Sequence, residues 1–183
     1  MSKARWLTLA AVMCVAAAPP AKRGRGDTSW EHTSREPVFS IRLPSIAWKR
    51  SDRPGPMLAS FHAFSWGTPV LAGVTSVRRQ TLAEFRAVVK DAKAEADKLD
   101  GRIGPATLEA EEPTPEGGLR AFVFTLEKAD GGEVFTGQAF IWNAGRTVRV
   151  IFEGQGKAMS RFFKAREKAE FDKLSRAVFR SVR

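Results

Sequence analysis

The chain has 183 residues, of which 43% are hydrophobic, 10% aromatic and 27% charged. This composition is that of a globular protein with a substantial core, and it excludes an intrinsically disordered chain. Lysine and arginine number 30 against 20 aspartates and glutamates, which gives a formal net charge of +10. A basic protein attracts anionic partners such as nucleic acid, a phospholipid surface or an acidic polysaccharide, and charge alone does not choose among them.

Residues 1–18 are predicted to be a secretory signal peptide. Lys3 and Arg5 precede an uncharged, mostly apolar run over residues 6–18, which is too short for a permanent membrane helix and ends in small residues. We therefore expect an exported protein, either periplasmic or extracellular. Cys14 is the only cysteine, so disulfides are not expected in the mature domain. Cys14 is either the lipid attachment site of a membrane-anchored lipoprotein or is discarded with the signal peptide.

Residues 19–36 are rich in proline, glycine and charge, and they are predicted to form a flexible linker. The remainder, residues 37–183, is predicted to be a single domain. Its first strand is expected at 38–43, "VFSIRL", because apolar and polar residues alternate there as in a half-buried strand. Pro44 ends this strand, since proline cannot donate a hydrogen bond to a continuing ladder.

Two further strands are predicted at 58–66 and 70–77, separated by a Gly-Thr-Pro turn signal. The clearest helix is expected to span residues 82–99. Thr81 and Glu84 have the spacing of a capping box, in which each side chain satisfies a free backbone amide of the first helical turn. Apolar residues then recur along one face at helical spacing.

The second half predicts a meander of antiparallel strands, because alternating runs are separated by short turns that contain Asp-Gly or Asn-x-Gly. These strands are expected at 106–112, 119–127, 133–142 and 147–154. A last helix is predicted from Ser160 onward. The order of elements lacks the strict alternation of parallel α/β folds. The fold class is therefore α+β, an antiparallel sheet of about six or seven strands flanked by two main helices.

Three stretches resemble the PsbP-like superfamily, which includes the PsbP extrinsic subunits of photosystem II, DcrB-type bacterial envelope proteins and Ran-GTPase-binding relatives. They are "FSIRLPSIAW" at 39–48, the capped helix after the third strand, and "FDKLSRAVFRSV" at 171–182. In the family the chain closes with a Ser-Phe-like pair, which is swapped here, with Phe179 before Ser181. The resemblance covers about residues 36–183 and implies an α/β/α sandwich that acts as a binding or assembly module, without catalysis or a cofactor. It carries over no functional residue.

One candidate partner contact follows the first predicted strand. Trp48 is succeeded by Lys49, Arg50 and Arg53, and tryptophan and arginine are favoured anchors at protein interfaces. The alternative is a tryptophan that closes the edge of the sheet, with a solvated basic loop after it.

The C-terminal segment, residues 157–183, holds nine lysines and arginines against three acidic residues. A basic helix of this kind is typical of proteins that lie on anionic lipid or bind a polyanion, and Lys164, Lys168 and Arg176 are the candidate contacts. The alternative is a solvated outer face on a helix that its phenylalanines pack onto the core.

No residue set predicts catalysis or a metal site. The histidines are His32, in the expected linker, and His62, and there is no cysteine pair or zinc-binding spacing. We expect an exported, non-enzymatic binding or assembly module of the cell envelope, whose partner is an envelope protein or an anionic surface. The alternatives are an anionic-membrane or polyanion-binding protein that uses the C-terminal helix, and a hydrolase built around His62. Nucleic acid is not expected as a partner, because the protein is predicted to be exported.

Overall fold

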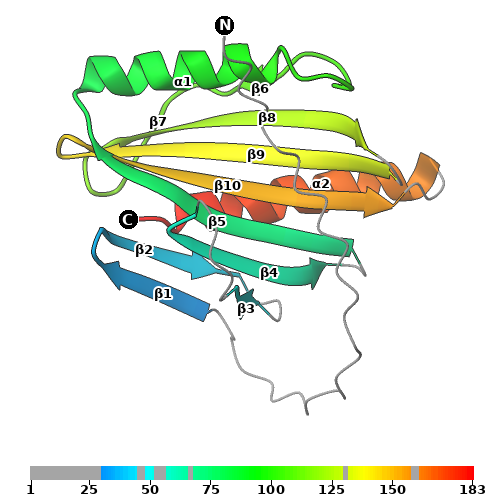
Figure 1. Ribbon diagram of the computed structural model, residues 1–183, viewed down its shortest axis with the longest axis horizontal. Coiled ribbons are helices and arrows are strands. Elements are labelled where there is room, and N and C mark those ends of the chain that lie inside the picture. Colours follow the sequence, from blue (N-terminus) through cyan, green and yellow to red (C-terminus); the bar gives the residue numbers. More distant parts are fainter. Residues whose placement is uncertain (1–29, 45–47, 52–56, 66–67, 130–131, 158–160) are drawn as a thin grey trace, which may run out of the picture.

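The computed structural model describes residues 30–44, 48–51, 57–65, 68–129, 132–157 and 161–183 (Figure 1). Its main sheet is built from β3 Lys49–Arg50, β4 Ala59–Ser65, β5 Thr68–Arg79, β6 Thr107–Leu108, β7 Glu112–Pro113, β8 Leu119–Ala129, β9 Gly132–Asn143 and β10 Arg146–Lys157. The strand order is β3-β4-β5-β10-β9-β8-β6, with β7 also paired to β8, and every pairing is antiparallel. Together with two long helices, this confirms the predicted α+β class.

The first helix, α1 Leu82–Ala96, begins at the predicted capping box. The Thr81 amide donates to the Glu84 carboxylate at 2.7 Å, and the Glu84 amide donates to the Thr81 hydroxyl at 3.3 Å. Phe85 and Val89 lie on the buried side of the helix, in an apolar cluster shared with β8 and β9. The helix therefore covers one face of the sheet over β8 and β9 (Figure 1).

The second helix, α2 Arg161–Arg180, packs on the opposite face, against β9 and β10. Its buried side includes Phe171, Val178 and Phe179. A Cβ atom at Gly154 of β10 would lie 2.8 Å from the Phe171 ring, so glycine there lets the helix approach the sheet closely. Within the described residues, no helix has both the length and the apolar character needed to cross a membrane.

A separate hairpin consists of β1 Trp30–Arg35 and β2 Val38–Leu43. It corrects one prediction, because residues 30–35 form a strand where a linker was expected. The strand predicted at 38–43 is confirmed, and it lies in this hairpin and not in the main sheet. Strand β1, "WEHTSR", is mostly polar and is fixed by backbone pairing with β2, so hydropathy gives no sign of it. Residues 19–29 lie outside the described part of the chain.

The hairpin is tied to the C-terminus. The backbone amides of Ser40 and Arg183 each donate to the other residue's carbonyl at 3.0 Å. The Ser181 hydroxyl donates to the Arg42 carbonyl at 2.6 Å and accepts from the Arg42 amide at 2.9 Å. The apolar side of β2 shares one core with β4, β5 and α2, so α2 and the hairpin together cover one face of the sheet.

Candidate functional site

The other face of the sheet is covered unevenly. Helix α1 packs over β8 and β9, and among the described elements no helix lies on the same side of β4, β5 and β10 (Figure 1). We call this side of the three strands the open face. Strand alternation and register assign to it Ser60, His62 and Phe64 of β4, Leu71, Gly73, Ser76 and Arg78 of β5, and Thr147, Arg149, Ile151 and Glu153 of β10. Leu58 comes just before β4, and its amide donates to the Val74 carbonyl of β5, so the same alternation places it on this face.

One end of the open face is cationic. Arg149 stands opposite Phe140, a member of the α1 cluster, and its guanidinium carbon lies 5.3 Å from the centre of the Phe140 ring. Its Nη2 donates to the side-chain oxygen of Gln138 at 2.6 Å. Burial lowers the pKa of Arg149, and the positive charge of Arg78 lowers this pKa further. The exposed Arg78 therefore lies close to the partly buried Arg149 on this face.

The backbone is irregular at this point. Arg149 pairs with Ser76 but Val150 pairs with Val74, so Thr75 is an extra residue on β5 and forms a β-bulge. The Thr75 hydroxyl donates to the Arg149 carbonyl at 3.3 Å. Bulges change the direction of nearby side chains and are common beside functional sites.

The opposite end of the open face is acidic. Burial raises the pKa of Glu153, and the negative charge of Glu127 raises this pKa further. Burial also raises the pKa of Glu127, against the lowering effect of a hydrogen bond with Thr125. The face thus has opposite charges at its two ends, with Ile151 between them on β10.

The Glu153→Gln variant is expected to be more stable than the wild type at pH 7, by about 1 kcal/mol. A carboxyl whose folded pKa is raised favours folding below its unfolded pKa of about 4.3, and that contribution is lost as pH rises through the folded pKa. The advantage of the variant should therefore disappear near pH 4. Urea unfolding at both pH values measures it. The exposed Glu95→Gln change is the control, with an effect below about 0.5 kcal/mol, and a loss of stability in Glu153→Gln at pH 7 would contradict the prediction.

The predicted contact around Trp48 needs correction. The Trp48 ring belongs to the core, and its indole N–H donates to the Pro44 carbonyl at 3.0 Å, as in the alternative in which this residue closes the sheet edge. Lys49 and Arg50 are exposed on β3, but they stand opposite His62 and Phe61 and so point to opposite faces of the sheet. Only Lys49 joins the open face. Arg53 lies outside the described residues.

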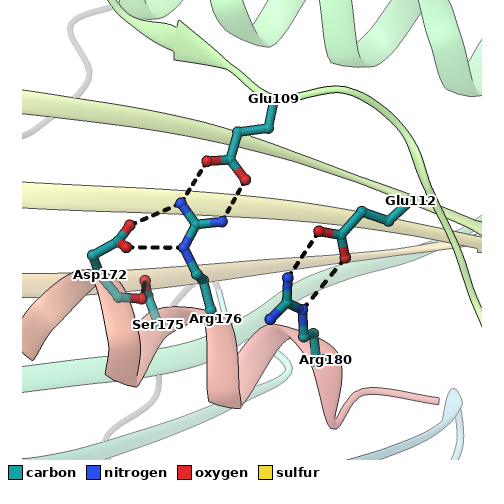
Figure 2. A network of polar contacts seen from close by, with 6 residues as sticks. All are labelled: Glu109, Glu112, Asp172, Ser175, Arg176 and Arg180. Atoms are coloured by element: carbon teal, nitrogen blue, oxygen red, sulfur yellow. Dashed lines mark hydrogen bonds and ion pairs between the residues drawn. The ribbon is translucent and has the colours of Figure 1, made fainter.

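Arg176 is the centre of an ion-pair network between α2 and the segment that connects β6 to β7 (Figure 2). Its guanidinium donates to both carboxylate oxygens of Glu109 at 2.5 Å and to both of Asp172 at 2.9 and 3.0 Å. Further along, Arg180 pairs with Glu112 at 2.8 Å. Arg183 pairs with Glu116 at 3.4 Å.

These pairs correct the expectation that Arg176 is available to a polyanion, because its donors already bind two carboxylates of the same chain. Lys164 and Lys168 lie in the N-terminal half of α2, and their side chains are outside the described part of the structure. Cys14 and the predicted signal peptide also fall outside it.

His62 lies on the open face, and its Nδ1 is buried without a hydrogen-bond partner. In the described part of the chain, no hydrogen bond links His62 to a serine or a carboxylate, so no catalytic pair is assembled there. Nor do the described residues include a group of three or more histidine, cysteine, aspartate or glutamate side chains that could bind a metal ion.

The sequence interpretation missed the cationic pair Arg78 and Arg149. A signal was present in the run "TVRVIFEG", where Val148, Val150 and Phe152 alternate with Arg149. An arginine in the middle of a predicted central strand is unusual enough to be singled out as a candidate site residue.

No protein-family model matches the sequence, and the search of curated proteins found no relative. Among solved structures, the chain is similar to LpqN, involved in cell envelope biogenesis of Mycobacterium tuberculosis, with 9% identity, a TM-score of 0.53 and 86% of each chain covered. It also matches the Ran-binding protein Mog1p of Saccharomyces cerevisiae, with 9% identity and a TM-score of 0.49, over 86% of this chain and 96% of that one. The chain therefore shares its overall fold with LpqN, and this fold agrees with the α+β architecture predicted from the sequence.

Proposed function

We propose that this protein is an exported, non-enzymatic binding module of the cell envelope, which contacts a partner protein through its open face. The observation that carries the proposal is the pair of large apolar side chains at the β4 side of that face. Phe64 is 58% exposed and Leu58 is 44% exposed. Exposed apolar groups flanked by charged residues, here Lys49 of β3, are typical of protein interfaces.

Two further observations support the envelope as the location. The chain begins with a predicted signal peptide, and it shares its fold with LpqN, a protein involved in cell envelope biogenesis. Since one fold serves many functions, neither observation names the partner.

The rival interpretations have less support. Helix α2 was the candidate polyanion contact, but its described arginines Arg176 and Arg180 are paired with acidic residues, as is Arg183 beyond it. The hydrolase alternative needs a nucleophile or an orienting carboxylate beside His62, and the described residues provide no such hydrogen bond.

A photo-crosslinking amino acid, p-benzoylphenylalanine, introduced at Phe64 in the native cell is expected to form a covalent adduct with an envelope protein. The matched control is the same amino acid at Val38, which is 55% exposed but lies on β2 of the hairpin, away from the open face. The intact mass of the protein that has not formed an adduct shows, in the same experiment, whether the signal peptide has been removed and the protein exported. We expect a chain that starts between Ala18 and Lys22, or at Cys14 with added lipid.

Equal adduct yields at Phe64 and Val38, or none at Phe64, would contradict the use of the open face. An uncut chain found only in the cytoplasm would overturn export. These two failures are separable, because one depends on the adduct and the other on the mass.

A further inference from the structure

The two arginines at the cationic end of the open face have no acidic partner among the described residues. The only hydrogen-bond acceptor of the Arg149 guanidinium among the described residues is the neutral amide of Gln138. Arg78, whose charge lowers the pKa of Arg149, has no ion pair within the same part of the chain. A partly buried cation without a counterion costs free energy, and a bound anion would offset this cost.

Two hydroxyl residues complete this corner of the sheet. Thr147 is the register partner of Arg78, and Ser76 is the register partner of Arg149. The Thr147 side chain is 3% exposed, and its Oγ1 is buried without a hydrogen-bond partner. Register partners lie about 5 Å apart and alternate residues of one strand about 7 Å apart. The two arginines therefore stand at diagonal corners of a small rectangle, with a hydroxyl at each of the other corners.

We propose that Arg78, Arg149, Ser76 and Thr147 form a binding site for a phosphate group, carried by a soluble phosphate ester or by a lipid headgroup. A phosphate monoester, such as glycerol 3-phosphate or the headgroup of phosphatidic acid, carries a charge of about −1.5 to −2 and presents three acceptor oxygens, which match two guanidinium groups and neighbouring hydroxyls. A carboxylate has one charge and two oxygens, so it would leave one arginine unbalanced. The site lies beside the bulge at Thr75, where the register of β5 against β10 shifts by one residue.

The test is calorimetric titration of the purified full-length mature protein with inorganic phosphate, with acetate as the comparison. We expect saturable binding of phosphate and weaker binding of acetate. Arg78→Gln and Arg149→Gln should each weaken phosphate binding at least tenfold. Arg149→Lys, which keeps the charge but loses the planar fork, should weaken it by a smaller factor. Arg78 is exposed, so its variant remains informative if an Arg149 variant fails to fold.

The matched control is Arg79→Gln, the adjacent residue of β5, which is also exposed but alternates to the other side of the strand. It removes the same charge and should change phosphate affinity less than about twofold if binding is local. Equal losses in Arg78→Gln and Arg79→Gln, no saturable phosphate binding, or equal binding of acetate would each overturn the proposal.

Two additional probes identify the source of the phosphate. Glycerol 3-phosphate represents a soluble ester, and phosphatidylcholine vesicles with and without phosphatidic acid represent a headgroup. If glycerol 3-phosphate or the phosphatidic acid vesicles bind the wild type but not Arg78→Gln, the result supports the site. The probe that binds then identifies the class of ligand. This inference rests on the proposed function only in that both place binding on the open face. Phosphate binding without a Phe64 adduct would refute only the partner protein, whereas an adduct without phosphate binding would refute only this site.

Discussion

The Phe179→Ala variant is expected to lose about 3–5 kcal/mol of unfolding free energy. Phe179 is fully buried on α2, and its ring centre lies 5.6 Å from that of Phe122 and 6.3 Å from that of Phe124, both on β8. Truncation removes these aromatic contacts and leaves a cavity between helix and sheet, which the rigid strands cannot close. Urea unfolding followed by circular dichroism measures the loss.

Two variants make this result interpretable. Phe64→Ala removes the same side chain from a position that is 58% exposed, so it should cost less than about 1 kcal/mol. Phe179→Leu keeps most of the apolar volume and should cost about 1.5 kcal/mol, which leaves a folded protein to compare. If Phe179→Ala cost no more than Phe64→Ala, the Phe179 ring would not be packed between α2 and the sheet as described.

Local sequence patterns predicted the start of α1 and the turn between β9 and β10, because capping and turn residues lie next to each other in the chain. The capping box fixed the start of α1, and the Asn-x-Gly turn joined β9 to β10, where Ala144 and Gly145 both have positive φ angles of 47° and 75°. Such a two-residue turn matches the twist of an antiparallel pair, so strand and turn signals agree there. By contrast, β6 and β7 are two-residue strands with no detectable period of their own.

The buried side of α2 was only partly predicted. Phenylalanines packed onto the core were one of the two predicted alternatives, and Phe171 and Phe179 are buried there. Val178 and Ser175 are buried as well, whereas Ala177 is exposed. The reason is that α2 contacts both the sheet and the β1–β2 hairpin. A helix between two surfaces buries a wider arc than the single stripe that hydropathy patterns assume.

The candidate sites depend on contacts between distant parts of the chain, which sequence patterns do not specify. Arg176 and Glu109 are 67 positions apart, and each is an ordinary charged residue of an apparently solvated segment. Arg78 meets Arg149 only because β5 and β10 are neighbours in a particular register with a bulge. Strand order and register are set by the whole core, so these pairs emerge only with the tertiary structure.

Replacing Arg176 with methionine is expected to lower the unfolding free energy by about 2–3 kcal/mol. The side chains of Arg176 and Glu109 are each 25% exposed, and the change leaves the carboxylates of Glu109 and Asp172 close together without their shared cation. Removing one partner of such a hydrogen bond is costly, because the charged group that remains is partly buried without its partner. Urea unfolding at low and moderate salt measures the effect.

Arg180→Met is the matched control, since Arg180 lies on the same helix and pairs with Glu112 but is 52% exposed. We expect it to cost less than about 1 kcal/mol and to depend more on salt. A double-mutant cycle with Glu109→Gln should give a coupling of at least about 1 kcal/mol for the Arg176 pair. Equal small effects of both arginine variants would mean that these cations contribute little inside the molecule, which would return α2 to consideration as a polyanion-binding surface. A large effect of Arg176→Met that is coupled to Glu109 would mean that the charge of Arg176 stabilises the fold. The open face would then remain the candidate surface for anion binding.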